Sequence, residues 1–131
     1  MKISRSTGYA LLALGYIAKN QDQKIILSQT ISKEYDIPLE YLLKIMQQMV
    51  RAGILRSKRG PRGGFSIAQQ PKKISMLQVV EAVDGPMSSQ QSLFETNVKS
   101  KFTNKIEAVY SKAISQAKAV LDKTKMSDLI A

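Results

Sequence analysis

Four positive charges surround a glycine-rich turn in the segment RSKRGPRGGFSIA, residues 56–68. Its basic side chains are Arg56, Lys58, Arg59 and Arg62, and its turn residues are Gly60, Pro61, Gly63 and Gly64. Basic side chains neutralise phosphates, and glycines let a backbone lie close to a narrow groove. We therefore predict that Arg59 and Arg62 enter the minor groove of duplex DNA. The alternative is a surface hairpin whose charges only keep the protein soluble.

The excess of positive charge is concentrated in the N-terminal half of the chain. Of the 131 residues, 20 are Lys or Arg and 10 are Asp or Glu, which gives a net charge of +10. Residues 1–73 hold thirteen basic and four acidic side chains, whereas residues 74–131 hold seven and six. This asymmetry favours a polyanionic partner, nucleic acid or an anionic membrane surface, at the N-terminal half. The length and the 44% hydrophobic content fit one compact domain.

The chain has no cysteine and no histidine, which removes most side chains used in catalysis and metal binding. Acid–base and nucleophilic chemistry have few candidates, and the phosphate-loop pattern GxxxxGK is absent. A disulfide framework, a zinc knuckle and a thiolate-held iron–sulfur cluster are excluded. We therefore predict that the protein is not an enzyme and holds no metal or cofactor. The absence of cysteine is compatible with a reducing cytoplasm, which is the location we expect.

The first apolar segment, YALLALGYIA at residues 9–18, imitates a signal peptide because Lys2 and Arg5 precede it. Ten residues are too few to cross a bilayer, and no convincing cleavage site follows. The apolar stripe consists of Tyr9, Leu12, Ala13, Tyr16 and Ile17, which have the spacing of an amphipathic helix. We interpret the segment as a helix that packs on the core, and we expect no membrane partner.

Two short helices joined by a tight turn are expected next. Ser28 is a good N-cap for the first, and Asp-Ile-Pro at 36–38 ends it. Its apolar side chains are Leu27, Ile31 and Tyr35, which lie four residues apart. Gly53 suits the left-handed position that ends the second helix.

The second of these helices has two different faces. One side carries Leu42, Ile45, Met46, Met49 and Val50, and the other carries Glu40, Lys44, Gln47 and Arg51, with Tyr41 and Gln48 at its flank. Two helices joined in this way form a helix-turn-helix, whose second helix enters the major groove of DNA. A polar face that is only solvated is the alternative.

Residues 54–58 and 65–68 read as two strands around the basic turn. A helix-turn-helix followed by a basic hairpin is a winged helix. The expected fold is therefore mainly α with a small β-hairpin wing, and residues 1–73 form its DNA-binding region.

The remaining residues, 74–131, are expected to form a connecting helix, a loop and a dimerisation helix within the same compact domain. Ser75 and Gln78 form a capping box, Asp-Gly-Pro at 84–86 ends the connecting helix, and residues 87–96 form a polar loop. The long helix carries an apolar stripe of Phe102, Ile106, Val109, Ala113, Ala117 and Val120, which Tyr110, Ile114 and Leu121 widen. The same helix of a second subunit would cover this stripe in a homodimer, unless the helix folds back on its own domain.

The sequence resembles the Rrf-two family of bacterial winged-helix transcription regulators. The resemblance rests on Gly8-Tyr9 after MKIS, on ISKEYDIPLEYLLKIMQQMVRAGIL at 31–55, RGPRGGF at 59–65, ISMLQVVEAVDGP at 74–86 and KMSDL at 125–129. It implies a homodimeric transcription factor, usually a repressor, that binds a double-stranded DNA operator and whose long C-terminal helix crosses to the partner subunit.

The resemblance also assigns DNA contacts residue by residue. It implies major-groove contacts by Glu40, Tyr41 and Lys44, minor-groove contacts by residues 59–64, and phosphate contacts by Ser4 and Ser28, with Lys2 close by. We add Gln48, at the flank of the polar helix face, and Lys58, at the base of the basic turn, to the predicted DNA contacts.

Two departures from the family pattern limit what can be transferred. Cluster-binding members have three cysteines where this chain has MSSQQSLFETNVKSKF at 87–102, and Leu43-Lys44 replaces the Glu-Gln with which some members read bases. The signal is therefore open: a small effector bound between the DNA-binding half and the long helix, a partner protein, or none. A basic RNA- or ribosome-associated protein is the alternative function, although the eight aromatic residues mostly have core spacing.

Overall fold

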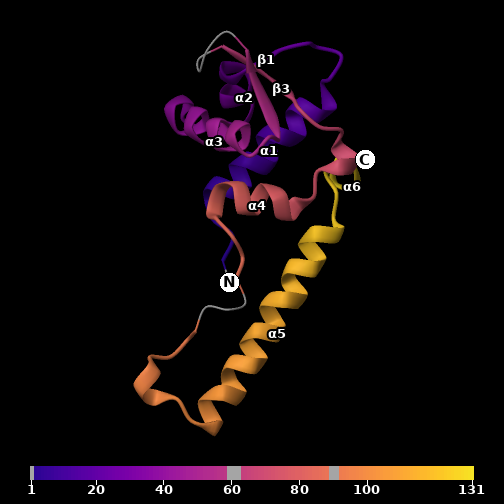
Figure 1. Cartoon of the computed structure of the whole chain (residues 1–131). Helices are drawn as coiled ribbons and strands as arrows, with labels where there is room; N and C mark the ends of the chain where they lie inside the picture. The colour runs from indigo at the N-terminus through magenta and orange to yellow at the C-terminus, as the bar shows by residue number, and fades with distance from the viewer. Residues whose placement is uncertain (1, 59–62, 89–91) are drawn as a thin grey trace.

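The computed structural model describes residues 2–58, 63–88 and 92–131. Its helices are α1 (Arg5–Lys19), α2 (Ser28–Tyr35), α3 (Leu39–Arg51), α4 (Met76–Asp84), α5 (Lys101–Lys123) and α6 (Met126–Leu129), with 3-10 helices η1 (Pro71–Lys73) and η2 (Thr96–Val98). Its strands are β1 (Ile26–Leu27), β2 (Leu55–Lys58) and β3 (Gly64–Ile67). The predicted fold class is confirmed, because a helix-turn-helix precedes a β-hairpin in a mainly helical chain (Figure 1).

Helix α1 runs through the centre of the compact part and supplies much of its core. It begins four residues before the predicted segment, because the Ser4 side chain accepts a hydrogen bond from the Thr7 N–H and caps it. The fully buried Ala10, Ala13 and Leu14 form its inner face. Leu12 was predicted on that face but is 43% exposed, because the buried stripe is rotated toward Thr7, Leu14 and Ala18.

The turn between α2 and α3 is as tight as predicted, but the start of α2 was predicted wrongly. Leu27 is the N-cap and Ser28 is the first helical residue, and no side chain caps this end. Leu27 belongs to β1, a strand absent from the sequence prediction, and is 52% exposed. At the far end, Asp36 adopts the left-handed conformation at φ 53°. Gly53 follows α3 at φ 76°, which confirms its predicted position after the helix.

The small sheet has the order β1-β3-β2, and both pairs are antiparallel. Phe65 on β3 is fully buried against the helices, opposite Ile26 of β1 and Ser57 of β2. Gly64 was predicted as a turn residue of the wing. It is instead the first residue of β3, buried and paired with Leu27 and Lys58.

Helix α4 belongs to the compact part, and α5 is attached to that part by its C-terminal end. The Ser75–Gln78 capping box opens α4, and Asp84 is its last residue, as predicted. Helix α5 extends away from the compact part along most of its length (Figure 1). Its C-terminal end is fixed, because the Met76 N–H donates to the Thr124 carbonyl and the Met126 N–H donates to the Ile74 carbonyl, both at 2.8 Å. Within the described residues, no helix is long and apolar enough to cross a membrane.

Candidate nucleic-acid interface

Helix α3 presents a polar face to solvent and an apolar face to the core, as its sequence predicted. Leu42, Ile45, Met46 and Met49 are buried, whereas Glu40, Tyr41 and Lys44 are exposed and Gln48 is half-buried. Leu43 is also buried, and Val50, predicted on the inner face, is half-buried. The apolar face therefore fixes the rotation of the helix, and the four predicted base-contacting side chains project from the other side.

Three of these side chains come together at one cavity. Tyr41, Lys44 and Gln48 line a hollow of about 300 Å³ whose lining also includes Ser4, Ser6 and Asp84. The Tyr41 hydroxyl is hydrogen-bonded to the Ser6 hydroxyl. The ring of Tyr41 also meets that of Tyr9 edge to face, with centroids 5.7 Å apart at 87°. Helix α1 therefore holds Tyr41 in place beside Lys44.

Asp84 is the acidic group that lines this hollow, and it ties the end of α4 to the start of α1. Its carboxylate accepts hydrogen bonds from the Ser4 N–H (3.0 Å), the Ser4 hydroxyl and the hydroxyl of the buried Thr7 (2.9 Å). Burial would raise the pKa of Asp84, but the hydrogen bonds from Ser4 and Thr7 together lower it below its usual value. The carboxylate therefore keeps its charge to a lower pH than an ordinary aspartate does.

The two serines predicted to contact phosphates, Ser4 and Ser28, are either hydrogen-bonded or buried in the structure. The Ser4 hydroxyl donates a hydrogen bond to Asp84, so a phosphate would have to replace that carboxylate as the acceptor. Ser28 is 2% exposed, which leaves little of its side chain for a phosphate to reach. Both phosphate contacts stay predictions, and neither hydroxyl is freely presented to solvent.

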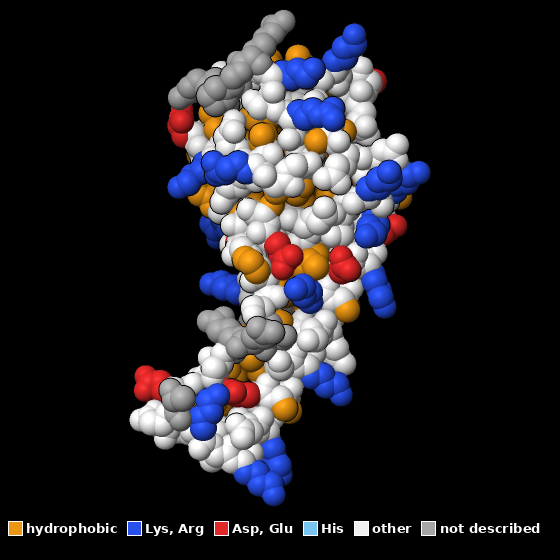
Figure 2. Space-filling model, viewed as in Figure 1, with side chains coloured by type: hydrophobic (Ala, Val, Ile, Leu, Met, Phe, Trp, Pro, Cys, Tyr) orange, Lys and Arg blue, Asp and Glu red, His pale blue; other side chains and the backbone are white. Residues whose placement is uncertain are grey.

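The hairpin places the described part of the wing at the same end of the molecule as α3 (Figure 1). Lys58 is exposed at the end of β2, and Gly63 is half-buried before β3. The predicted wing residues Arg59, Gly60, Pro61 and Arg62 lie outside the described residues. Figure 2 shows Lys and Arg side chains over both the compact part and the length of α5.

Sequence reasoning missed Asp84, Ser6 and Thr7 as parts of this site. Asp84 was recognised only as part of the signal that ends α4. Its partners Ser4 and Thr7 precede it by 80 and 77 residues, and no local spacing indicates that contact. Lys2, predicted near the phosphates, is exposed and lines a second cavity, which shares Asp84 with the first.

Sequence comparison places the chain among bacterial regulators. The Rrf2 family model, described as "Iron-dependent Transcriptional regulator", matches residues 3–131. A putative HTH-type transcriptional regulator of Aquifex aeolicus is 40% identical over 81 residues, which are 62% of this chain and 56% of that protein. The HTH-type transcriptional regulator IscR of Cereibacter sphaeroides is 33% identical over 86 residues, 64% of this chain and 56% of IscR. The chain thus spans about half the length of these curated relatives.

Two solved structures have the same fold over almost the whole chain. CymR (YrzC), the global cysteine regulator of B. subtilis, has a TM-score of 0.81 at 23% identity, covering 99% of this chain and 96% of CymR. T. potens IscR has a TM-score of 0.76 at 21% identity, covering 99% of this chain and 86% of IscR. At these identities the likeness shows the fold alone.

The iron in the family description does not fit the side chains of this chain. Iron–sulfur clusters are held by cysteine thiolates, in some centres with histidine, and the sequence contains neither residue. Among the described residues, no group of three His, Cys, Asp or Glu side chains could hold a metal ion.

The family match covers 129 consecutive positions and so includes the helix-turn-helix, the hairpin, α4 and the long helix. It agrees with the resemblance seen in the sequence motifs and with the fold of the two solved regulators. The chain belongs to the Rrf2 family of transcriptional regulators.

Proposed function

We propose that the protein is a homodimeric, sequence-specific DNA-binding regulator that represses transcription without an iron–sulfur cluster. The observation that carries the proposal is the outer face of α3, where Tyr41, Lys44 and Gln48 line one surface hollow while the opposite face is buried. A helix presented in this way can enter a major groove, and Gln and Lys side chains can bond base edges there.

The hairpin supports the same assignment. Lys58 is exposed at the end of β2, where it pairs with Gly64 of β3 at the base of the wing. Residues 59–62, which contain two arginines, connect β2 to β3 and are proposed to reach the adjacent minor groove. Residues 1–73, with their excess of nine positive charges, would then supply most of the phosphate contacts.

The long helix supports a homodimer. Phe102, Val109 and Val120 are 73%, 70% and 64% exposed in the single chain, and they share one side of α5 with the exposed Ala113. The other two predicted interface residues, Ile106 and Ala117, are half-buried. Ile114 points another way and is buried, so α5 packs on its own domain chiefly through a different side. A second copy would cover the exposed stripe and would place two reading helices on paired half-sites.

The family resemblance implies that the protein represses transcription. A dimer bound at a promoter would do so by excluding RNA polymerase.

We propose that the regulator has two regions, the DNA-binding region 1–73 and the dimerisation region 74–131. The contact between the start of α1 and the end of α4 joins them into one compact unit.

The decisive experiment is to select a duplex from random-sequence DNA and to titrate it against a scrambled duplex at several salt concentrations. We expect tighter binding to the selected duplex, with log K falling linearly with log salt. Equal affinities for both duplexes would contradict a specific regulator. Equal competition by RNA would favour the RNA-binding alternative. Transcription from a promoter carrying the selected site should fall when the protein is added, and a rise would contradict repression.

A further inference from the structure

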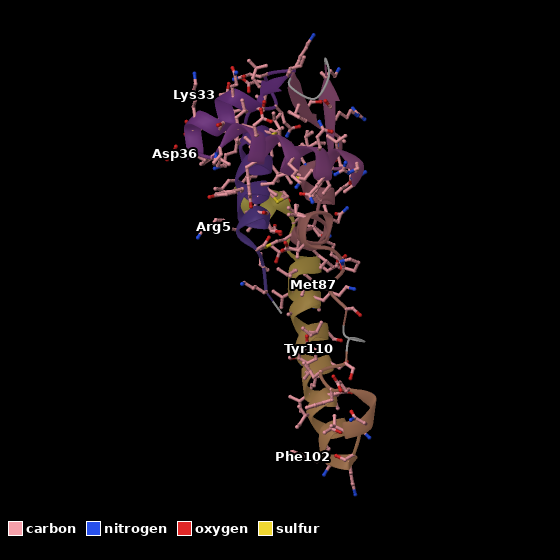
Figure 3. The ribbon with its side chains drawn as sticks, turned by 90° about the vertical axis from the view of Figure 1, so that its left-hand side faces the viewer. Arg5, Lys33, Asp36, Met87, Phe102 and Tyr110 are labelled. Carbon is pink, nitrogen blue, oxygen red and sulfur yellow. The ribbon has the colours of Figure 1, made fainter. Side chains whose placement is uncertain are left out.

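A second cavity lies between the end of α4, the segment that follows it, and α5. Its volume is about 180 Å³, and its lining includes Lys2, Val80, Asp84, Met87, Tyr110 and Ile114. Figure 3 shows Met87 and Tyr110 one below the other along α5, between the compact part and the free end of that helix. A cavity of this volume can hold only a small molecule, with roughly as many heavy atoms as a small amino acid.

The cavity has one positive and one negative group in its lining. Lys2 is exposed and forms no ion pair with any other described residue. The Asp84 carboxylate accepts three hydrogen bonds, which leaves one of its roughly four acceptor positions open. Asp84 is also the last residue of α4, where the helix dipole adds negative potential. The cavity can therefore take a ligand that carries both an ammonium group and an anionic group.

An apolar wall completes the lining of this cavity. It consists of Val80 and Ile114, which are 1% and 5% exposed, and of Met87 from the segment after α4. That segment is held in place, because the Met87 N–H donates to a Glu81 carboxylate oxygen at 2.8 Å. The same carboxylate lies 3.9 Å from the Lys118 ammonium, which links α4 to α5. The wall is thus built before any ligand arrives.

We propose that this cavity binds a small α-amino acid with an apolar side chain. The ammonium group of the ligand bonds Asp84, its carboxylate pairs with Lys2, and its side chain packs on Val80, Met87 and Ile114. The chemistry of the lining alone supports this binding, whereas its regulatory consequence rests on the proposed DNA-binding function.

Asp84 connects the ligand to the DNA-reading surface. The same carboxylate lines the hollow beside Lys44 and Gln48, and it holds the start of α1 through Ser4 and Thr7. Two residues after Ser4, the Ser6 hydroxyl holds Tyr41 of α3. A ligand ammonium at the open acceptor position of Asp84 neutralises the same carboxylate and so weakens its hydrogen bonds from Ser4 and Thr7. Occupancy therefore shifts the start of α1 and with it Tyr41, so DNA affinity differs between the free and occupied protein.

The binding test uses the full chain, L-valine, and two half-ligands, isobutylamine (no carboxylate) and 3-methylbutanoate (no ammonium). Binding is measured by calorimetry and by NMR of methyl-¹³C methionine. We expect the Met87 methyl signal to shift with L-valine while that of the core residue Met46 does not. Each half-ligand should bind about tenfold more weakly or worse, since a hydrogen bond to a charged group is lost.

The methionine signals also distinguish this cavity from another one. Met126 lines an apolar hollow between α1 and α6, so a shift of Met126 instead of Met87 would place the ligand there and overturn the proposal. Absence of any shift at millimolar L-valine, L-leucine and L-methionine would overturn it as well.

Substitutions test the two charged contacts separately. Lys2→Gln should weaken L-valine binding about tenfold or more without affecting folding, because Lys2 is exposed and has no described partner. Lys72→Gln removes the same charge from η1, away from the cavity, and should bind L-valine like the wild type. Asp84→Asn should also weaken L-valine binding, and urea denaturation checks that this variant is folded. Unchanged binding by the Lys2 variant would contradict the proposed carboxylate contact.

The regulatory step is measured as the ratio of DNA affinities with and without saturating L-valine, on the selected duplex. We expect a ratio of about fivefold or more in the wild type and a ratio near one in Asp84→Asn. A protein that binds L-valine but no duplex would refute the proposed function and leave the binding site standing. A protein that binds the selected duplex but none of the amino acids would refute the binding site alone.

Discussion

A β-carbon added to Gly64 would lie 1.6 Å from the Cγ2 atom of Ile25. It would also lie 3.1 Å from the Cβ atom of Ile25, which cannot rotate away as the Cγ2 methyl can. Gly64 is paired with Leu27 in this part of the sheet, so the segment before β1 crosses directly over the glycine. The missing side chain therefore permits the close approach of β1 to β3.

Gly64→Ala should lower the free energy of unfolding by about 1–3 kcal/mol, since the new methyl group overpacks the sheet. Gly8→Ala is the matched control, because a β-carbon there has no atom within 4 Å and the residue lies inside α1. That control should gain about 0.5–1 kcal/mol from helix propensity. Urea denaturation at one protein concentration measures both, and a Gly64 variant as stable as the wild type would disprove the packing role.

This glycine illustrates what the sequence could and could not predict. The helices of the helix-turn-helix, the hairpin and α4 follow from local signals, such as the 3.6-residue period of α3 and the Ser75–Gln78 capping box. Gly64 was assigned to the turn because its neighbours are turn residues. Its actual constraint comes from Ile25, 39 positions earlier, and a two-residue strand such as β1 has no periodicity to reveal it.

Part of the candidate site could likewise be predicted from the sequence, and part of it could not. The outer face of α3 was predictable, because one helix determines which of its side chains point outward. The Asp84 contacts were not, because they depend on how α1 packs against α4. The Ser28 cap was mispredicted because β1 continues to Leu27, which leaves Ser28 inside the helix and buried.

Asp84 should make the stability of the protein depend on acid pH. Its pKa in the folded protein is lowered from the ordinary 3.8, because the hydrogen bonds from Ser4 and Thr7 outweigh the opposing effect of burial. The charged carboxylate thus favours the folded state. This contribution is fully present above pH 3.8 and is lost as the pH falls through the lower folded value.

Asp84→Asn should therefore be less stable than the wild type near neutral pH, and the difference should shrink below about pH 4. Urea midpoints from about pH 6 to about pH 3 measure this difference. The pKa of Glu107 is also lowered, chiefly by the hydrogen bond from Ser92, but that slope is common to both proteins and cancels. A difference that stays constant over the whole range would show that the carboxylate charge contributes nothing.

Gln48→Ala should weaken binding to the selected duplex by about 1–3 kcal/mol, because a Gln side chain on this face of α3 can bond a base edge. Affinity for a scrambled duplex should not change, since no phosphate contact is removed. Gln70→Ala is the control: Gln70 is exposed before η1 and its side chain caps nothing. Equal losses on both duplexes would make Gln48 a backbone contact rather than a base reader.

Val109→Glu should dissociate the proposed dimer, because a charge would be buried in an apolar interface. Val109 is 70% exposed in the single chain, so the fold of each subunit should survive. Ser115→Glu places the same charge at an exposed position on another side of α5 and should remain dimeric. Sedimentation at micromolar concentration measures both variants. A dimeric Val109 variant would locate the interface elsewhere, and a monomeric wild type would reject the dimer itself.

Protein prepared without oxygen and supplied with iron and sulfide should stay colourless and free of stoichiometric iron. Cluster iron needs thiolates, occasionally joined by imidazole, and the chain has no cysteine and no histidine. The six methionines offer only uncharged thioethers, and Met46 and Met49 are fully buried in the core. Carboxylates could substitute only if several converged, and no three do so among the described residues. Visible absorption that rises with bound iron would refute this prediction. Iron bound without sulfide, and lost on Glu95→Gln, would instead point to carboxylate ligands.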